Sequence, residues 1–306
     1  MLDLSSRVAI VTGAGTGIGE AIATALSRRG CAVLVNDYGT DVAGRGGEEQ
    51  SRADAAATRI RKTGGTAVAC AVPVGTQESA AAIIDAAMSA FGRVDILVNN
   101  AGFGDSGSLE EVNEDRWRFG LDVHLNGPRA LMHLVWPHMR EAGFGRIVNV
   151  ASSVSFGRAG YSNFASAKAG LIGLSRAAGL EGTGAGICVN AILPTADTRA
   201  TRSGLEAAGE LRIRDWFIEH FPPHQVGEAV AYLCSDQCAI SGDAFIVGGG
   251  RFARMGYAVA PGFFDPQISA EAVAENFGQV SDFTDADIVF DNHGEQNSYM
   301  RFIPRP

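Results

Sequence analysis

The chain has 306 residues, 46% of them hydrophobic, and a formal net charge of −9. This length suits one large α/β domain or two small ones with a sizeable core. The acidic balance argues against nucleic acid and anionic membranes as partners, because both bind clustered basic residues. No apolar run approaches the length of a membrane span, and the first residues lack the basic start and apolar stretch of a signal peptide. We therefore expect a cytoplasmic protein.

The first elements are predicted to form a strand, a glycine loop, a helix and a second strand. Residues 7–11 are mostly apolar and rich in β-branched side chains, which predicts a buried strand. Residues 12–19, Thr-Gly-Ala-Gly-Thr-Gly-Ile-Gly, follow at once, and a helical apolar pattern covers residues 20–29. A second apolar run at residues 32–35 ends in Asn36-Asp37.

This unit is typical of a dinucleotide site. Glycines let the backbone approach a pyrophosphate, and the helix N-terminus offers free N–H groups to it. Asp37 can accept hydrogen bonds from a ribose diol and would repel a 2′-phosphate, so NAD is expected rather than NADP. The predicted cofactor contacts in this unit are Gly13, Thr16, Gly17, Ile18, Gly19 and Asp37.

Strands and helices alternate along the following residues. Strands are predicted at residues 66–72, 94–98, 146–150, 188–193 and 244–247, and helices at residues 51–62, 78–91, 114–140 and 161–180. In the helix over 114–140, Pro128 and Pro137 are expected kink or boundary points. This alternation predicts an α/β fold, a doubly wound parallel sheet of about seven strands with helices on both faces. Ligands should then bind beyond the carboxyl ends of the strands.

The order of the motifs resembles the short-chain dehydrogenase/reductase family. The glycine loop, Asn-Asn-Ala-Gly at residues 99–102, a serine after the fifth strand and a lysine on the next helix follow the family's order within residues 4–250. Val123-His124-Leu125 and the residues after 250 are most similar to the (3R)-hydroxyacyl-CoA dehydrogenase portion of the peroxisomal multifunctional β-oxidation enzymes. The resemblance implies a Rossmann fold and an NAD(H)-dependent oxidoreductase that interconverts a secondary alcohol and a ketone. It also implies cofactor contacts from Asn100, Ala101, Gly102, Lys168 and Pro194.

The resemblance implies catalytic positions as well. Family members use a serine to bind the substrate oxygen, a tyrosine to transfer the proton, and a lysine to bind the nicotinamide ribose and lower the tyrosine pKa. Here the serine is Ser152 and the lysine is Lys168, and His124 stands where most members have asparagine. The tyrosine position, four residues before the lysine, is Phe164.

Phe164 leaves three interpretations open. Phenylalanine has no proton to transfer, and loss of a general acid typically costs about 10²–10⁴-fold in rate. In the first, the residue is an engineered substitution in an active enzyme. In the second, it is native, and the proton comes from water, from His124 or from Tyr161. In the third, the site binds NAD without catalysis, as a sensor or scaffold. Tyr161 lies on the same helix face as Lys168 but about 10.5 Å away by helix rise, which favours a packing role.

The remaining predictions concern the substrate, the partners and the domains. The loop 195–221, with Trp216, Phe217 and Phe221, resembles a substrate lid. Its aromatic residues suit a bulky apolar substrate, and they suit a place in the core equally well. The family resemblance implies a hydroxyacyl thioester or a steroid-like alcohol as substrate. We expect no metal, because His220 and His224 lack a third ligand. Small residues along 161–180 and the family resemblance indicate a homodimer or homotetramer. Residues 1–250 should form the dinucleotide-binding domain, and residues 251–306 an extension packed on the same or a partner subunit.

Overall fold

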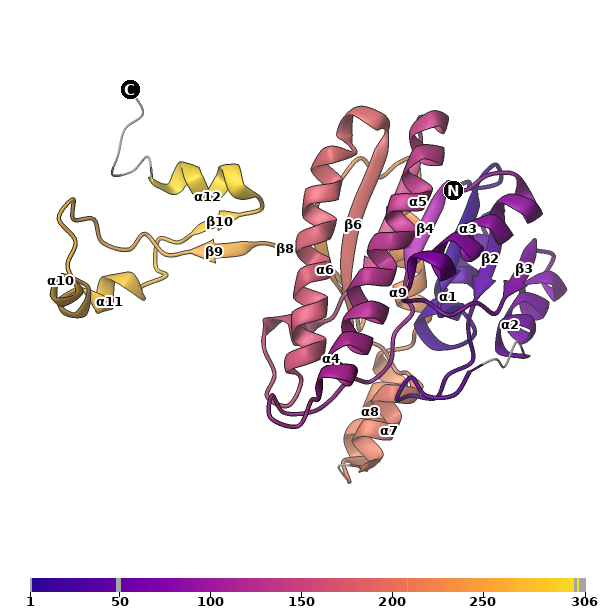
Figure 1. Ribbon diagram of the computed structural model, residues 1–306, viewed down its shortest axis with the longest axis horizontal. Helices are drawn as coiled ribbons and strands as arrows, with labels where there is room; N and C mark the ends of the chain where they lie inside the picture. The colour runs from indigo at the N-terminus through magenta and orange to yellow at the C-terminus, as the bar shows by residue number, and fades with distance from the viewer. Residues whose placement is uncertain (1, 48–50, 208, 300–301, 303–306) are drawn as a thin grey trace. The chain divides into compact units, whose positions relative to one another are not determined.

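The computed structural model describes residues 2–47, 51–207, 209–299 and 302 of the chain. Its central feature is an eight-stranded sheet in the order β3-β2-β1-β4-β5-β6-β7-β8 (Figure 1). The strands are β1 (Val8–Thr12), β2 (Ala32–Asn36), β3 (Ala67–Cys70), β4 (Ile96–Asn99), β5 (Gly145–Val150), β6 (Ile187–Pro194), β7 (Ala244–Gly248) and β8 (Arg251–Met255). Every pairing from β3 to β7 is parallel. The predicted doubly wound Rossmann fold is confirmed.

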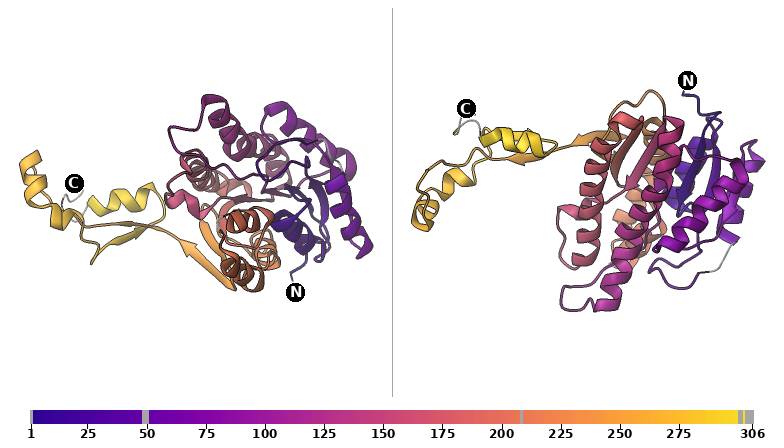
Figure 2. Two further views of the ribbon diagram at one scale, coloured as in Figure 1. Left: turned by 90° about the horizontal axis from the view of Figure 1, so that it is seen from below. Right: turned by 45° about the horizontal axis from the view of Figure 1, so that its top comes forward.

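Helices cover both faces of this sheet (Figure 2). One core lies between the sheet and α1 (Gly17–Ser27), α2 (Ser51–Lys62) and α9 (His224–Leu233). The other core is formed with α3 (Gln77–Phe91), α5 (Gly127–Ala142) and α6 (Ser162–Glu181). Strand β1 is buried over its whole length, as an inner strand of a parallel sheet must be. The carboxyl ends of the parallel strands therefore share one edge, where the predicted site residues gather.

The helix predicted over residues 114–140 is interrupted just before Pro128, one of its two expected kink or boundary points, and continues through Pro137, the other. It consists of α4 (Glu114–Leu121), a π-helical turn at Asp122–Asn126, and α5. Pro128 has no N–H to donate to the carbonyl of His124. The helix instead forms one wider, π-helical turn, in which the N–H of Gly127 donates to the carbonyl of Asp122, five residues back.

The segment 195–221 is helical rather than an extended loop. It contains α7 (Arg199–Ala207) and α8 (Leu211–His220). No described side chain of α8 is fully buried, and Trp216 is 49% exposed. The rings of Trp216, Phe217 and Phe221 contact one another with centroids 4.8–5.6 Å apart. The three aromatic residues therefore form a cluster on α8 and at its C-terminal end.

An eighth strand was not predicted. Gly249 and Gly250 both have positive φ and join β7 to β8 by a two-residue turn. The first compact unit ends at Ala253, within β8, and the second unit begins at Arg254. The extension was expected to begin three residues earlier, at residue 251.

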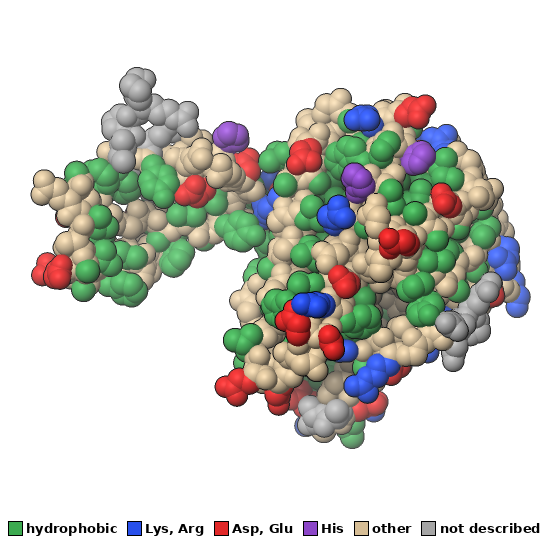
Figure 3. Space-filling model, in the orientation of Figure 1, with side chains coloured by type: hydrophobic (Ala, Val, Ile, Leu, Met, Phe, Trp, Pro, Cys, Tyr) green, Lys and Arg blue, Asp and Glu red, His purple; other side chains and the backbone are tan. Residues whose placement is uncertain are grey.

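The second unit is small and apolar on its surface. It contains β9 (Tyr257–Val259) and β10 (Asp287–Val289), which pair antiparallel, and the short helices α10 (Ala270–Glu275), α11 (Phe277–Val280) and α12 (Asn292–Ser298). Its exposed large side chains include Tyr257, Phe264, Ile268, Phe277, Phe283 and Ile288 (Figure 3). Packing of this unit against a subunit stays a prediction. Within the described residues of the whole chain, no helix has the length and hydropathy needed to cross a bilayer.

Candidate active site

The glycine loop after β1 has the close packing that its sequence predicts. Gly13 and Gly17 have φ of +63° and +61°. A Cβ on Gly19 would lie 2.2 Å from the carbonyl oxygen of Gly13 and 2.4 Å from Nδ2 of Asn100, so only glycine fits. Helix α1 begins at Gly17, with Thr16 in an extended conformation before it and no side-chain cap on its N–H groups. Ile18 packs against the core. The loop therefore leaves a bare helix N-terminus for an anion.

Asp37 and Asn100 fix this loop from either side. The Oδ2 atom of Asp37 accepts from the N–H of Gly15 at 2.9 Å, and its Oδ1 accepts from the N–H of Gly39 at 2.8 Å. Nδ2 of Asn100 donates to the carbonyls of Thr12 and Gly13 at 2.8 and 3.1 Å. Ala101 and Gly102 follow in the same turn, and Pro194 ends β6 at the same edge of the sheet. These groups fit a dinucleotide, since glycine backbone, a helix N-terminus and one carboxylate lie together at the carboxyl ends of the strands.

Ser152 and Lys168 lie at the end of β5. Ser152 begins a short 3-10 turn, and its Oγ accepts from the N–H of Val154 at 3.2 Å. The Nζ atom of Lys168 is buried and donates to the carbonyl of Val150 at 2.7 Å. Burial lowers the pKa of Lys168 to about 8. The ammonium is therefore held at the strand end by one carbonyl, two residues before Ser152.

Phe164 faces both Lys168 and His124. The Nζ of Lys168 lies 5.5 Å from the centroid of the Phe164 ring, and the His124 ring meets that ring edge-on at 4.9 Å. His124 is fully buried and lies on the π-helical turn, and neither ring nitrogen has a hydrogen-bond partner among the residues that the structure describes. Burial, followed by the charges of Lys168 and Arg116, lowers its pKa well below 6.5. His124 is thus a neutral imidazole enclosed behind aromatic rings.

Tyr161 lies just outside helix α6, as its N-cap residue. The guanidinium of Arg158 lies 4.6 Å from its ring centroid, and its backbone bridges to Gly107. These contacts agree with the packing role that its sequence position favours.

The sequence missed a buried polar network beside the site. Asp105 is 2% exposed and pairs with Arg116 at 2.7 Å, and Nδ2 of Asn163 donates to its other oxygen at 2.6 Å. Burial outweighs this pairing, so the pKa of Asp105 is raised. The three residues come from a loop and two helices, and no local spacing signals their contact.

Arg52 was also missed. Its Cβ lies 3.0 Å from where a Cβ on Gly15 would stand, so α2 brings a cation to the Asp37 side of the loop. Its guanidinium donates to the carbonyl of Thr40.

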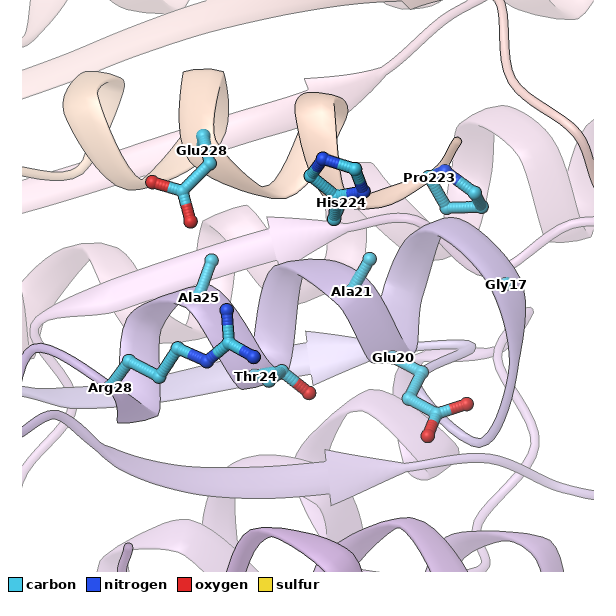
Figure 4. Close-up of a pocket in the computed structure, with 9 residues that line it drawn as sticks. All are labelled: Gly17, Glu20, Ala21, Thr24, Ala25, Arg28, Pro223, His224 and Glu228. Atoms are coloured by element: carbon cyan, nitrogen blue, oxygen red, sulfur yellow. The ribbon is translucent and has the colours of Figure 1, made fainter. Parts of the chain in front are cut away.

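A separate surface groove of about 300 Å³ lies between α1 and α9. Figure 4 shows His224 and Glu228 of α9 opposite Ala21 and Ala25 of α1. None of the predicted catalytic side chains lines it. Among the described residues, no group of three or more His, Cys, Asp or Glu could hold a metal ion.

The family model for the short chain dehydrogenases matches residues 7–206, which include the glycine loop, Ser152, Phe164 and Lys168. The chain belongs to this family. It is therefore an oxidoreductase by family, and the fold and motif order agree.

Relatives extend the match over most of the chain. A short-chain type dehydrogenase/reductase of Mycobacterium tuberculosis is 37% identical over 94% of this chain and 98% of its own length. Peroxisomal multifunctional enzyme type 2 of Mus musculus is 33% identical over 93% of this chain, but this chain spans only 38% of that protein. The predicted resemblance to the multifunctional enzymes is confirmed.

Solved structures give the same assignment. The full-length peroxisomal multifunctional enzyme type 2 from Drosophila melanogaster matches with a TM-score of 0.77 and 27% identity, over 98% of this chain and 50% of that one. A 7α-hydroxysteroid dehydrogenase complexed with NADH and 7-oxo glycochenodeoxycholic acid matches with a TM-score of 0.70 and 28% identity, over 81% of this chain and 95% of that one.

Proposed function

We propose that the chain is an NAD(H)-dependent oxidoreductase that interconverts a bulky secondary alcohol and the corresponding ketone. The observation that carries the proposal is the position of Lys168, whose buried ammonium donates to the carbonyl of Val150 at the end of β5, two residues before Ser152, in a Rossmann fold. Asp37 supports NAD over NADP, because a carboxylate accepts from a ribose diol and repels a phosphate. A bound nicotinamide would donate or accept the hydride.

Each side chain has a role that its surroundings support. The Ser152 hydroxyl binds the substrate oxygen, since Oγ is half-buried and still has a proton to donate after accepting from Val154. Lys168 is a cation that would bind ribose hydroxyls and stabilise negative charge near the Phe164 ring. His124 contributes shape and low polarity, because its enclosed imidazole is neutral near pH 7.

The substrate class follows from α7 and α8. The cluster of Trp216, Phe217 and Phe221 presents large apolar surface, and a carbonyl on a bulky apolar body would gain most from it. The relatives include multifunctional enzymes of peroxisomes and a hydroxysteroid dehydrogenase bound to a bile acid derivative. A hydroxyacyl thioester or a steroid-like alcohol is the proposed substrate.

Phe164 favours a second candidate, a dinucleotide-binding sensor or scaffold. With phenylalanine here, the proton must come from water or another group, and the reaction would be slow. The two candidates agree on NADH binding and differ in turnover.

A turnover assay on the unaltered protein separates them. NADH oxidation is followed with bulky ketones, including 3-oxoacyl thioesters and oxosteroids, and NAD⁺ reduction with the matching alcohols. The enzyme proposal expects slow turnover that Lys168→Met abolishes. Binding of NADH with no turnover on any pair would favour the sensor, and failure to bind NADH would overturn both.

A further inference from the structure

The loop after β2, residues 38–47, contacts the loop after β4; we call it the strap. In the sheet, β1 lies between β2 and β4. The N–H of Gly104, in the loop after β4, donates to the carbonyl of Val42 in the strap at 2.8 Å. A contact between these two loops must therefore span the carboxyl end of β1, where the glycine loop lies. In Figure 1 the strap runs from β2 towards α4.

Arg116 of α4 joins the two loops. Its Nη1 donates to the carbonyl of Ala43 in the strap at 3.2 Å, and its Nη2 donates to the carbonyl of Gly104 at 3.2 Å. Its Nε donates to Oδ1 of buried Asp105 at 2.7 Å. The three bonds come from three different nitrogens of one planar guanidinium. A lysine has a single side-chain nitrogen and could not place its donors at all three positions.

The strap also packs on an aromatic stack that reaches the catalytic position. Gly44 has a φ of +76°, and a Cβ there would lie 2.7 Å from the ring of Phe103. Phe103 contacts His124 with ring centroids 4.6 Å apart, and His124 contacts Phe164 at 4.9 Å. The strap, Phe103, His124 and Phe164 thus form one contiguous set of contacts.

We propose that Arg116 is a positioning residue for the dinucleotide, and that it latches the strap over the glycine loop so that a bound cofactor is retained. The inference rests on the proposed function. A dinucleotide that extended from Asp37 to Ser152 would pass the glycine loop at the end of β1, which the strap spans, and its release would then require the contacts of Val42 and Ala43 to break. Losing the latch should raise the rate of cofactor dissociation more than it changes the rate of association.

The first test compares two arginines on one helix. NADH release is measured by stopped-flow fluorescence, with excess NAD⁺ as the displacing ligand. Arg116→Ala should raise the dissociation rate about tenfold or more, the scale of lost hydrogen bonds to a charged group. Arg118→Ala is the control, because the side chain of Arg118 is 70% exposed and pairs with Glu114 one turn away. Arg116→Lys should restore little of the retention.

A second pair of variants leaves the buried Asp105–Arg116 pair intact. Gly44→Ala and Gly46→Ala impose similar backbone strain, because Gly44 and Gly46 have φ of +76° and +69°. A methyl group on Gly44 would meet the ring of Phe103, whereas at Gly46 no atom of the described residues lies within 4 Å. Gly44→Ala should release NADH several-fold faster than Gly46→Ala. Equal dissociation rates within both pairs, in a protein that binds NADH, would overturn the latch and leave the proposed function standing. No NADH binding by the unaltered protein would overturn both.

Discussion

Asp37→Ala should narrow the preference for NAD over NADP. The carboxylate is held in place by the N–H groups of Gly15 and Gly39, with further lone pairs free for a ribose diol. A hydrogen bond to a charged group contributes about 1.5–3 kcal/mol, so its loss should weaken NADH binding by about 10–10²-fold. NADPH should bind no worse, because the change removes a negative charge next to its 2′-phosphate.

Calorimetric titration with NADH and NADPH measures this gap directly. Asp54→Ala is the control, since Asp54 is an exposed carboxylate on α2. Asp37→Asn keeps an acceptor for Gly15 or Gly39 and separates loop geometry from charge. Equal affinities of the unaltered protein for NADH and NADPH would refute the role of Asp37. Arg52 would then be the cation that binds the 2′-phosphate.

Two further predictions concern stability and assembly. Because burial lowers the pKa of Lys168 from 10.5 to about 8, the unfolded chain binds more protons between these values and stability rises with pH. Between pH 8 and pH 10.5, the free energy of unfolding in urea should rise by about 3 kcal/mol for the unaltered protein relative to Lys168→Met. A difference between the two proteins that stays constant with pH would contradict the burial argument. Sedimentation at micromolar concentration should show a homodimer or homotetramer paired through α5 and α6, since a C₂ axis makes such a face self-complementary. A monomer alone would contradict that pairing.

The sequence predicted the dinucleotide loop well because its determinants are local. Gly13, Gly17 and Gly19 lie within one turn, and each is required by a positive φ or a close backbone contact. The alternation of strands and helices also fixed the parallel sheet, since a chain of this pattern buries its apolar runs in only one way. Ser152 follows β5, and Lys168 lies on the next long helix, α6, from which it reaches the last residue of β5. The fold itself therefore brings both residues to the end of β5.

What the sequence could not show depends on contacts between distant segments. Arg116 and Asp105 lie eleven residues apart, and their link to Ala43 in the strap depends on sheet order. Pro128 signalled an interruption of the long helix, but the π-helical form of the turn at Asp122–Asn126 could not be read from the periodic pattern. The polar residues of 195–221 were read as a loop, although α7 and α8 form there with little burial.

The central claim is that this is a dehydrogenase site lacking one hydroxyl, and Phe164→Tyr tests it. The Lys168 ammonium lies 5.5 Å from the Phe164 ring centroid. At about 5 Å, in an effective dielectric of about 20, a positive charge stabilises a phenolate by about 3 kcal/mol, enough to bring a phenol near neutrality.

The measurement is deuterium transfer from 4-deuterated NADH to a bulky ketone, followed in the product alcohol by mass spectrometry. The account predicts that Phe164→Tyr raises the rate about 10²-fold or more, and that Phe156→Tyr on an exposed ring and Tyr161→Phe have little effect. Transfer that Phe164→Tyr leaves unchanged and Tyr161→Phe abolishes would contradict it, because the proton would then come from Tyr161.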